Sequence, residues 1–313
     1  MHELLDGLLV LIVLALALGS VVTGGLSTAV ACFVSYGLLL AFVWLRVQAV
    51  DVAMTEAAIG AGLTGALLIG AAARLGGGAE PAGTTRTART RRALAALAAA
   101  AIALPLAACL LLLPEPAPTL APQVAQAMPA LEVGNPITAV LLGFRSADTL
   151  LEAIVLLIAL IGVWSLGPDR FWGGRPGLAA APDPEGMLAW LARVLVPVGV
   201  LVALYLLWAG ADHPGGKFQA ATVLAAMWLL VMMSGLADAP AIGGRWLRIG
   251  VVVGPAVFLL LGAAGAALAG AFLDYPPGWA KVWIVAIEFA LLPSLAITLA
   301  LVFAGPAQRQ GRP

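Results

Sequence analysis

Long apolar runs separated by polar or Pro/Gly-rich breaks are the feature of this sequence that most constrains its fold. Nine runs are close to the about 20 residues that an α-helix needs to cross the hydrocarbon core of a bilayer. Their predicted bounds are 4–22, 27–47, 51–73, 93–113, 148–167, 188–208, 218–236, 246–271 and 281–304. Uninterrupted Leu, Ala and Val favour helices over the alternating strands of a barrel. The sequence therefore predicts an all-α polytopic membrane protein with about nine transmembrane helices.

Composition supports this class and argues against several functions. Hydrophobic residues make up 62% of the chain and charged residues 10%, whereas soluble domains are about half apolar and about a quarter charged. A formal net charge of zero gives no sign of a basic face for nucleic acid. The chain has no nucleophile elbow, P-loop or dinucleotide fingerprint, and neither histidine has a second metal ligand at a suitable spacing. We expect no enzyme activity, no cofactor and no metal site.

The basic residues predict how the chain is oriented. With nine spans and the N-terminus outside, 12 Lys and Arg residues fall in cytoplasmic segments, and four fall outside, namely Arg46, Arg145, Lys217 and Lys281. The positive-inside rule then favours an N-out, C-in topology. Residues 137–145 are apolar but too few to cross, so they are predicted to form an interfacial or half-inserted helix. The segments 74–92, 114–136 and 168–187 are polar or rich in Pro and Gly, and the last reads as a linker.

Carboxylates inside the spans are the candidate functional groups. An ionisable residue at mid-membrane costs about 2.5–3.5 kcal/mol on insertion scales, so each one needs a partner, water or a function. Asp51 and Glu56 open the third span, Asp148 and Glu152 open the fifth, and Glu288 lies inside the ninth. We predict that these five residues contribute to an ion or proton path.

Asp148 and Glu152 are four residues apart and share a helix face, with Arg145 near the same side. Carboxylates near an arginine suit a proton or cation relay, because each group tunes the next. An alternative is that Asp148 caps the helix and Arg145 anchors it at the interface. Glu152 lies a full turn deeper, which favours a functional role.

Asp51 and Glu56 are five residues apart, so about 140° separates them on a regular α-helix. A π-bulge would bring them nearer one face, and Gly60 and Gly62 would ease that distortion. We expect Asp51 to be interfacial. Glu56 is either a functional carboxylate or a structural hydrogen-bonding group, and the glycines are alternatively close-packing positions.

Glu288 has no opposite charge in its own span, so it is expected to be neutral, hydrated or paired with another helix or subunit. The residues around Pro214 most simply form a tight outer turn between spans six and seven. His213 and Lys217 flank this turn and are supporting candidates, although Lys217 could merely snorkel to the interface.

Three stretches resemble members of one family. AVDVAMTEAAIGAGLTGALL (49–68) resembles an MbhD-type hydrogenase-subunit domain, which also occurs near the C-terminus of the large Mrp antiporter subunit MrpA. NPITAVLLGFRSADTLLEAIVLLIALIGV (135–163) resembles the MbhE-type segment that follows it. The chain from RVLVPVGVLVALYLLWAGADHPGGKFQAA (193–221) onward resembles the MrpB (MnhB) family. The chain thus looks like the C-terminal part of MrpA fused to MrpB.

This resemblance implies a division into an MbhD-like three-helix segment (1–92), an MbhE-like two-helix segment (93–167), a linker (168–187) and an MrpB-like four-helix domain (188–313). The MbhD-type helices are similar to the NuoJ subunit of complex I, whose third helix carries a π-bulge. The chain departs from the family pattern at Gly143, Ala211 and Lys217, which stand where the family has an acid, a histidine and a glycine.

The function implied is that of an accessory ion-translocating subunit of a multisubunit Na+(cation)/H+ antiporter in a bacterial or archaeal cytoplasmic membrane. Expected partners are large antiporter-like subunits, a small NuoK-like subunit and the lipid bilayer, with Na+ and H+ as the transported ions and no nucleic acid. A second hypothesis is a coupling subunit of a hydrogenase-like or complex I-like redox-driven complex. A third is a scaffold whose acids only hold helices together.

Overall fold

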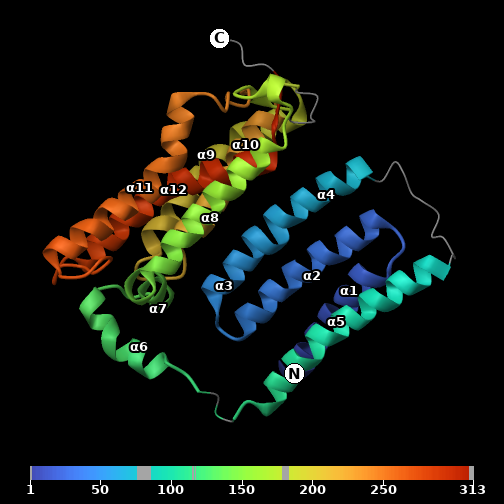
Figure 1. Cartoon of the computed structure of the whole chain (residues 1–313), viewed down its shortest axis with the longest axis horizontal. Helices are drawn as coiled ribbons and strands as arrows, with labels where there is room; N and C mark the ends of the chain where they lie inside the picture. Colours follow the sequence, from blue (N-terminus) through green and yellow to red (C-terminus); the bar gives the residue numbers. More distant parts are fainter. Residues whose placement is uncertain (1, 76–85, 115, 117, 178–182, 310–313) are drawn as a thin grey trace.

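The computed structural model describes residues 2–75, 86–114, 116, 118–177 and 183–309. The N-terminal part consists of α1 (His2–Val22), α2 (Leu26–Arg46), a third span built from α3 (Val50–Thr55), η1 (Glu56–Leu63) and α4 (Thr64–Leu75), and α5 (Arg86–Leu112). Figure 1 shows these helices on one side of the molecule and the later helices on the other. The predicted break at 74–92 falls partly on 76–85, which lie outside the described residues.

The second part begins with short helical pieces. They are α6 (Ala121–Ala127), η3 (Met128–Leu131), α7 (Pro136–Thr138) and η4 (Ala139–Phe144). The long helices that follow are α8 (Ser146–Ser165), α9 (Met187–Ala209), α10 (Lys217–Met233), α11 (Arg245–Leu268) and α12 (Ala280–Ala304). In Figure 1 the broken element of short pieces runs below the bundle of long helices.

The chain is an all-α polytopic membrane protein, with eight helices in its described part that are long and apolar enough to cross a bilayer. The remaining predicted span, 218–236, corresponds to α10, which has only 17 residues and is shorter than the other eight helices. At 1.5 Å per residue it is about 26 Å long, against an apolar thickness of about 30 Å. Gly216 precedes it, and Gly235 adopts a left-handed φ of 77° just after it. These glycines end the helix on both sides.

Prolines in the predicted break at 114–136 start helices instead of preventing them. Proline stands at the first or second position of α6, η3 and α7, where its missing N–H is not needed by the helix. The pieces Ala121–Leu131 and Pro136–Phe144 meet at a 90° bend. The expected short helix at 137–145 is therefore present, as part of a broken element.

The π-helical distortion expected in the third span is confirmed. η1 runs from Glu56 to Leu63 and contains both Gly60 and Gly62. The Thr64 hydroxyl donates a hydrogen bond of 2.9 Å to the carbonyl of Ile59, five residues earlier. This side-chain bond has the same five-residue spacing as the backbone hydrogen bonds of a π-helix. A Cβ at Gly37 would lie 3.2 Å from the Ala61 Cβ, which shows how closely α2 and η1 pack.

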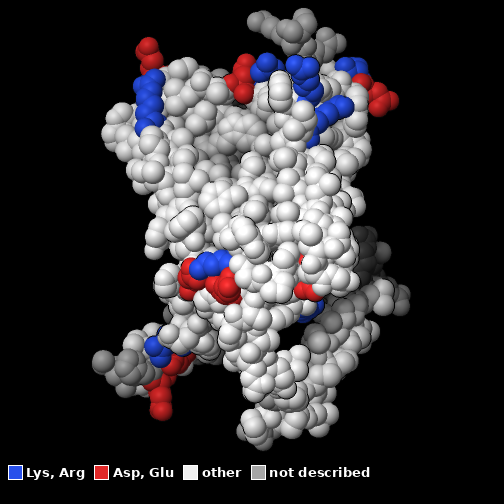
Figure 2. Space-filling view, turned by 90° about the vertical axis from the view of Figure 1, so that its left-hand side faces the viewer, with Lys and Arg blue, Asp and Glu red and all other residues white. Residues whose placement is uncertain are grey.

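Helices α8–α12 form the main core, together with residues 131–142. A Ser294 hydroxyl joins α11 to α12, because it accepts from the Gly254 N–H and donates to the Gly250 carbonyl, both at 2.8 Å. Charged side chains in Figure 2 gather at the upper end and in the lower half of the face shown, with an uncharged belt between them. This pattern fits a bundle surrounded by lipid.

The predicted linker 168–187 carries structure of its own. It contains the 3-10 turn η5 (Asp169–Phe171) and β1 (Arg175–Pro176), which pairs antiparallel with β2 (Ala307–Arg309) near the C-terminus. Residues 178–182 lie outside the described residues. The linker thus closes one end of the α8–α12 bundle, beside buried Trp164 and Ile242.

Candidate functional site

The turn between α9 and α10 is anchored by the third span. The Asp51 carboxylate accepts hydrogen bonds from the Gly215 N–H (2.9 Å) and from the Asn135 side-chain amide (3.4 Å). Gly216 adopts a φ of +121°, a conformation that glycine tolerates and other residues rarely adopt. Asp51 is 8% exposed, so protein covers this acid where α3 meets the turn.

The segment 134–138 completes the anchor. Asn135 caps α7 by accepting from the Ile137 N–H at 2.9 Å, and its amide also donates to the His213 carbonyl at 3.0 Å. The Thr138 hydroxyl donates to the Gly210 carbonyl at 2.6 Å. These contacts hold the broken helix against the turn with few exposed backbone groups.

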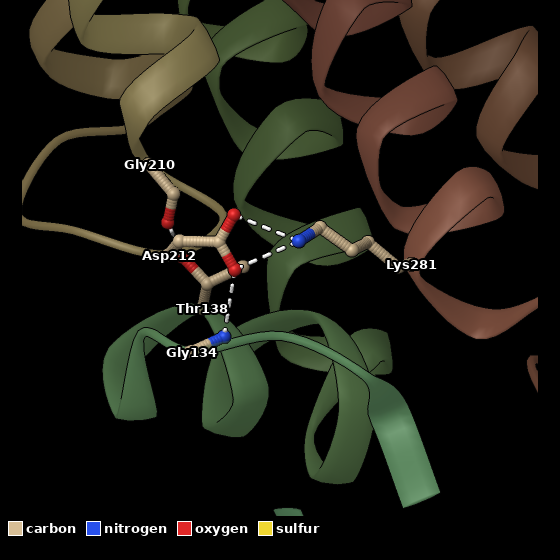
Figure 3. Close-up of polar contacts among 5 residues, drawn as sticks. All are labelled: Gly134, Thr138, Gly210, Asp212 and Lys281. Carbon is tan, nitrogen blue, oxygen red and sulfur yellow. Dashed lines mark hydrogen bonds and ion pairs between the residues drawn. The ribbon is translucent and has the colours of Figure 1, made fainter. Parts of the chain in front are cut away.

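An ion pair ties the same region to α12. The Lys281 ammonium lies 2.7 and 2.8 Å from the two Asp212 carboxylate oxygens, and the Gly134 N–H donates to Asp212 at 3.1 Å (Figure 3). The hydrogen bond from Lys281 is the main cause that lowers the pKa of Asp212 below its ordinary value. Both side chains are partly exposed, so water screens the pair.

This ion pair predicts a small acid sensitivity. A carboxyl with a lowered folded-state pKa stabilises the fold fully above its ordinary value of 3.8, and that stabilisation is lost as the pH falls through the lower value. For an exposed pair we expect about 0.5 kcal/mol. Lys281→Met should reduce the fall in thermal midpoint between neutral pH and pH values below 3.8. An equal fall in both proteins would contradict this role.

A cavity of about 240 Å³ lies directly inside the turn and collects four of the predicted ionisable residues. They come from four different elements and are Asp51 of α3, Glu152 of α8, Lys217 of α10 and Glu288 of α12. Glu152 is exposed, so it stands at the open side of the cavity. The other three are buried, with 3–8% of their surface exposed.

Glu288 and Lys217 are the most buried of these four residues, each with 3% of its surface exposed. One Glu288 oxygen accepts a long hydrogen bond of 3.4 Å from the Lys217 backbone N–H, and the other accepts none from the described residues. The Lys217 ammonium lies 4.9 Å from the centre of the Phe218 ring, and Lys217 shares the cavity with Glu288 and Glu152. Among the described residues it forms no ion pair within 4.0 Å.

A second cavity, of about 260 Å³, lies on the other side of Asp51. Its lining includes Asn135, Asp212 and His213, and it shares Asp51 with the first cavity. We call the second cavity the outer cavity and the first the inner cavity. Asp51 is thus the titratable residue that lines both cavities.

The remaining predicted residues lie elsewhere. Asp148 forms an ion pair of 2.5 Å with Arg145 at the exposed start of α8, where the N-cap residue makes no side-chain capping hydrogen bond. Glu56 is half-buried and lines neither cavity. The π-helix begins only at Glu56, so the chain from Asp51 to Thr55 is regular α-helix. Asp51 and Glu56 therefore do not lie on one face of the third span.

Neutral polar residues of the site were missed by a search for ionisable groups. Gln219 is 8% exposed and donates to the Thr55 hydroxyl at 3.0 Å and to the Asp51 carbonyl at 3.4 Å. Asn135 is 3% exposed. An amide side chain inside or beside an apolar run was the signal available for both, because a buried amide needs hydrogen-bond partners just as a charge needs compensation.

Comparisons with known proteins agree with this architecture. Residues 11–77 match the MbhD family model, which describes the D component of MBH, and residues 187–305 match "domain related to MnhB subunit of Na+/H+ antiporter". The two matched regions together cover more than half of the chain. No curated protein matches the chain significantly.

Two solved structures share the fold. A chain of the Mrp complex from a Dietzia species is 22% identical, with a TM-score of 0.73 over 98% of this chain and 35% of that one. A chain of the membrane-bound sulfane sulfur reductase, an archaeal respiratory membrane complex, is 22% identical, with a TM-score of 0.55 over 68% of this chain and 96% of that one. This chain therefore spans about a third of the length of the Mrp-complex chain that it matches. In this chain an MbhD domain and a domain related to the MnhB subunit of Na+/H+ antiporters are joined in one polypeptide, with the fold of a chain of the Mrp complex.

Proposed function

We propose that this chain is an ion-translocating subunit of a multisubunit Na+(cation)/H+ antiporter, and that protons pass through Asp51, Lys217, Glu288 and Glu152. The observation that carries the proposal is the pair of cavities that share Asp51. The outer cavity brings water toward Asp51 from the side of Asp212. The inner cavity connects Asp51 to the buried Lys217 and Glu288 and opens at Glu152.

Energetics support a functional use of these groups. Titratable side chains inside a span cost free energy unless they are paired or hydrated, and Glu288 has an oxygen without a partner among the described residues. A structural carboxylate would be expected to satisfy both oxygens. A carboxylate that alternates between the charged and the protonated form needs space around it, which the inner cavity supplies.

Neighbouring subunits complete the path. Glu152 is exposed on the membrane-spanning helix α8, so in the bilayer it faces either lipid, which is costly, or a partner. Large antiporter-like subunits and a small NuoK-like subunit are the proposed partners, with Na+ and H+ as the transported ions. The proposed location is a bacterial or archaeal cytoplasmic membrane, with the N-terminus outside and the C-terminus inside.

Glu56 is a proposed path residue outside the two cavities. Its carboxylate lies beside Gly60, where an added Cβ would collide with it, and it accepts no hydrogen bond from the described residues. A half-buried carboxylate without such a bond fits contact with a partner subunit or water. Asp148 is proposed to position the start of α8 through Arg145.

The proposed domain division is 1–92, 93–167, 168–187 and 188–313. The matched regions 11–77 and 187–305 support its first and last parts. The contacts of Asn135 and Thr138 with the turn of the last part support a single working unit across these boundaries.

A role in a redox-driven complex is the second candidate. The structural likeness to a chain of the sulfane sulfur reductase favours it. In that case the same carboxylates would couple proton movement to electron transfer in partner proteins, and this chain would still carry no reaction centre.

We expect the chain to need its partners for transport. Purification through a tag on this chain, followed by identification of the bound subunits, should recover large antiporter-like subunits. In vesicles, the recovered complex should convert a Na+ gradient into a pH gradient, and the chain alone should not. Recovery of iron–sulfur subunits would favour the redox complex, and full exchange by the single chain would contradict the need for partners.

A further inference from the structure

Lys217 lines the inner cavity, the space through which protons are proposed to pass. Lys217 is the first residue of α10 and is 3% exposed, so its positive charge is carried into the bundle. It lines the inner cavity together with Glu288 on α12 and Glu152 on α8, and among the described residues it forms no ion pair within 4.0 Å. It is therefore a tethered basic group that shares the cavity with two glutamates.

Charge balance then determines what else the inner cavity can hold. Three carboxylates, those of Asp51, Glu152 and Glu288, line the cavity with this one lysine, in surroundings where an uncompensated charge is costly. Asp51 accepts hydrogen bonds from the Gly215 N–H and the Asn135 amide, so the lysine is left to the two glutamates. These glutamates need one further positive charge, and a proton bound directly to a carboxylate oxygen supplies it. A Na+ ion would be repelled by the ammonium and would need several oxygen ligands. Among the described residues, no three His, Cys, Asp or Glu side chains are placed together to bind a metal.

Size does not exclude Na+. The inner cavity of about 240 Å³ is large compared with the about 30 Å³ that one water occupies, so water or a partly hydrated ion would fit. Hydroxyl and amide oxygens of Thr55, Thr138 and Gln219 also line it. The charge of Lys217 is thus the feature that discriminates between a proton and an alkali cation.

We propose that Lys217 is a specificity-determining residue that makes the inner cavity a proton path and keeps alkali cations out of it. This inference rests on the proposed function and assigns the ion at that site. It predicts that removing the ammonium uncovers an alkali-cation site between Glu152 and Glu288. Na+ would then cross the proposed complex at another place.

Binding of Na+ to the purified full-length chain in lipid nanodiscs tests this without a transport assay. A ligand that binds only the folded state raises the thermal midpoint in a saturable way. Lys217→Met should gain a saturable rise with NaCl over a choline chloride control of equal ionic strength, and the wild type should show none. Lys217→Arg, which keeps the charge, should behave as the wild type. Lys281→Met is the matched control, because it removes a lysine that is paired with Asp212 outside the inner cavity.

A second substitution locates the new site. In the Lys217→Met background, Glu288→Gln should abolish the gained Na+ response. A Na+ response of the wild type that Glu288→Gln removes would overturn the proposal, whether or not the lysine variants fold. A folded Lys217→Met chain with no Na+ response would also overturn it. Loss of transport by the complex would instead bear on the proposed function, because none of these binding results depends on transport.

Discussion

Replacement of Glu288 or Glu152 by glutamine should abolish the Na+-driven pH change in vesicles while the complex still assembles. Glutamine keeps the size and a hydrogen-bond acceptor, so the Lys217 N–H retains its partner at Glu288. It cannot bind and release a proton near neutral pH. Because both residues line the inner cavity and belong to different helices, the path would be interrupted at either position.

Aspartate should be milder than glutamine at both positions, because it keeps the proton site and only shortens the reach. Asp148→Asn is the matched control. It removes a carboxylate from the same helix one turn before Glu152, but that carboxylate is paired with Arg145 and lines neither cavity. Transport should remain near normal in this control.

Glu56→Gln, measured in the same assay, extends the test to the third span. We expect lower transport with normal complex yield, because Glu56 is proposed to contact a partner or water. If the glutamine variants of Glu56, Glu152 and Glu288 all transported normally and only alanine disturbed complex yield, these acids would be structural. The scaffold hypothesis would then replace the proposed path.

The sequence predicted the features that depend on local pattern. Hydrophobic runs located the spans to within a few residues for most helices, because lipid makes length and apolarity decisive. The π-helix was predicted from a five-residue acid spacing, two glycines and the NuoJ resemblance, and η1 begins at one of those acids. The cost of charge in a span also selected the residues that the inner cavity brings together.

Features that depend on three-dimensional contact could not be predicted from the chain alone. Asp51 was expected at the interface because it opens a span, yet the turn before α10 covers it. The second π-helix, η4, has no glycine pair or acid spacing to mark it, and the hydroxyl of Tyr275, far along the chain, donates to its Leu142 carbonyl at 2.6 Å. Such contacts join residues more than a hundred positions apart and leave no periodic signal.

Asp51 offers the second large expected effect, on folding as well as on transport. Asp51→Ala would leave the buried Gly215 N–H without its acceptor and would leave the Asn135 amide with only the His213 carbonyl. Each buried donor left unsatisfied costs about 1–3 kcal/mol. Because these bonds hold the third span to the turn before α10, we expect a large fall in thermal midpoint and in complex yield.

Asp51→Asn separates the structural role of this residue from its role in the path. The asparagine oxygen can still accept from Gly215, so folding and complex yield should stay close to the wild type. Asparagine cannot carry a proton between the outer and inner cavities, and transport should therefore fall to the level of vesicles without the complex. Normal transport by a well-assembled Asp51→Asn complex would contradict a role of Asp51 in the proton path. Asp51 would then only stabilise the turn before α10, and protons would enter through another group. Thr55→Val is the control for packing, since Thr55 lines the inner cavity but does not titrate. This variant should lose the hydrogen bond from Gln219, and its transport should stay close to that of the wild type.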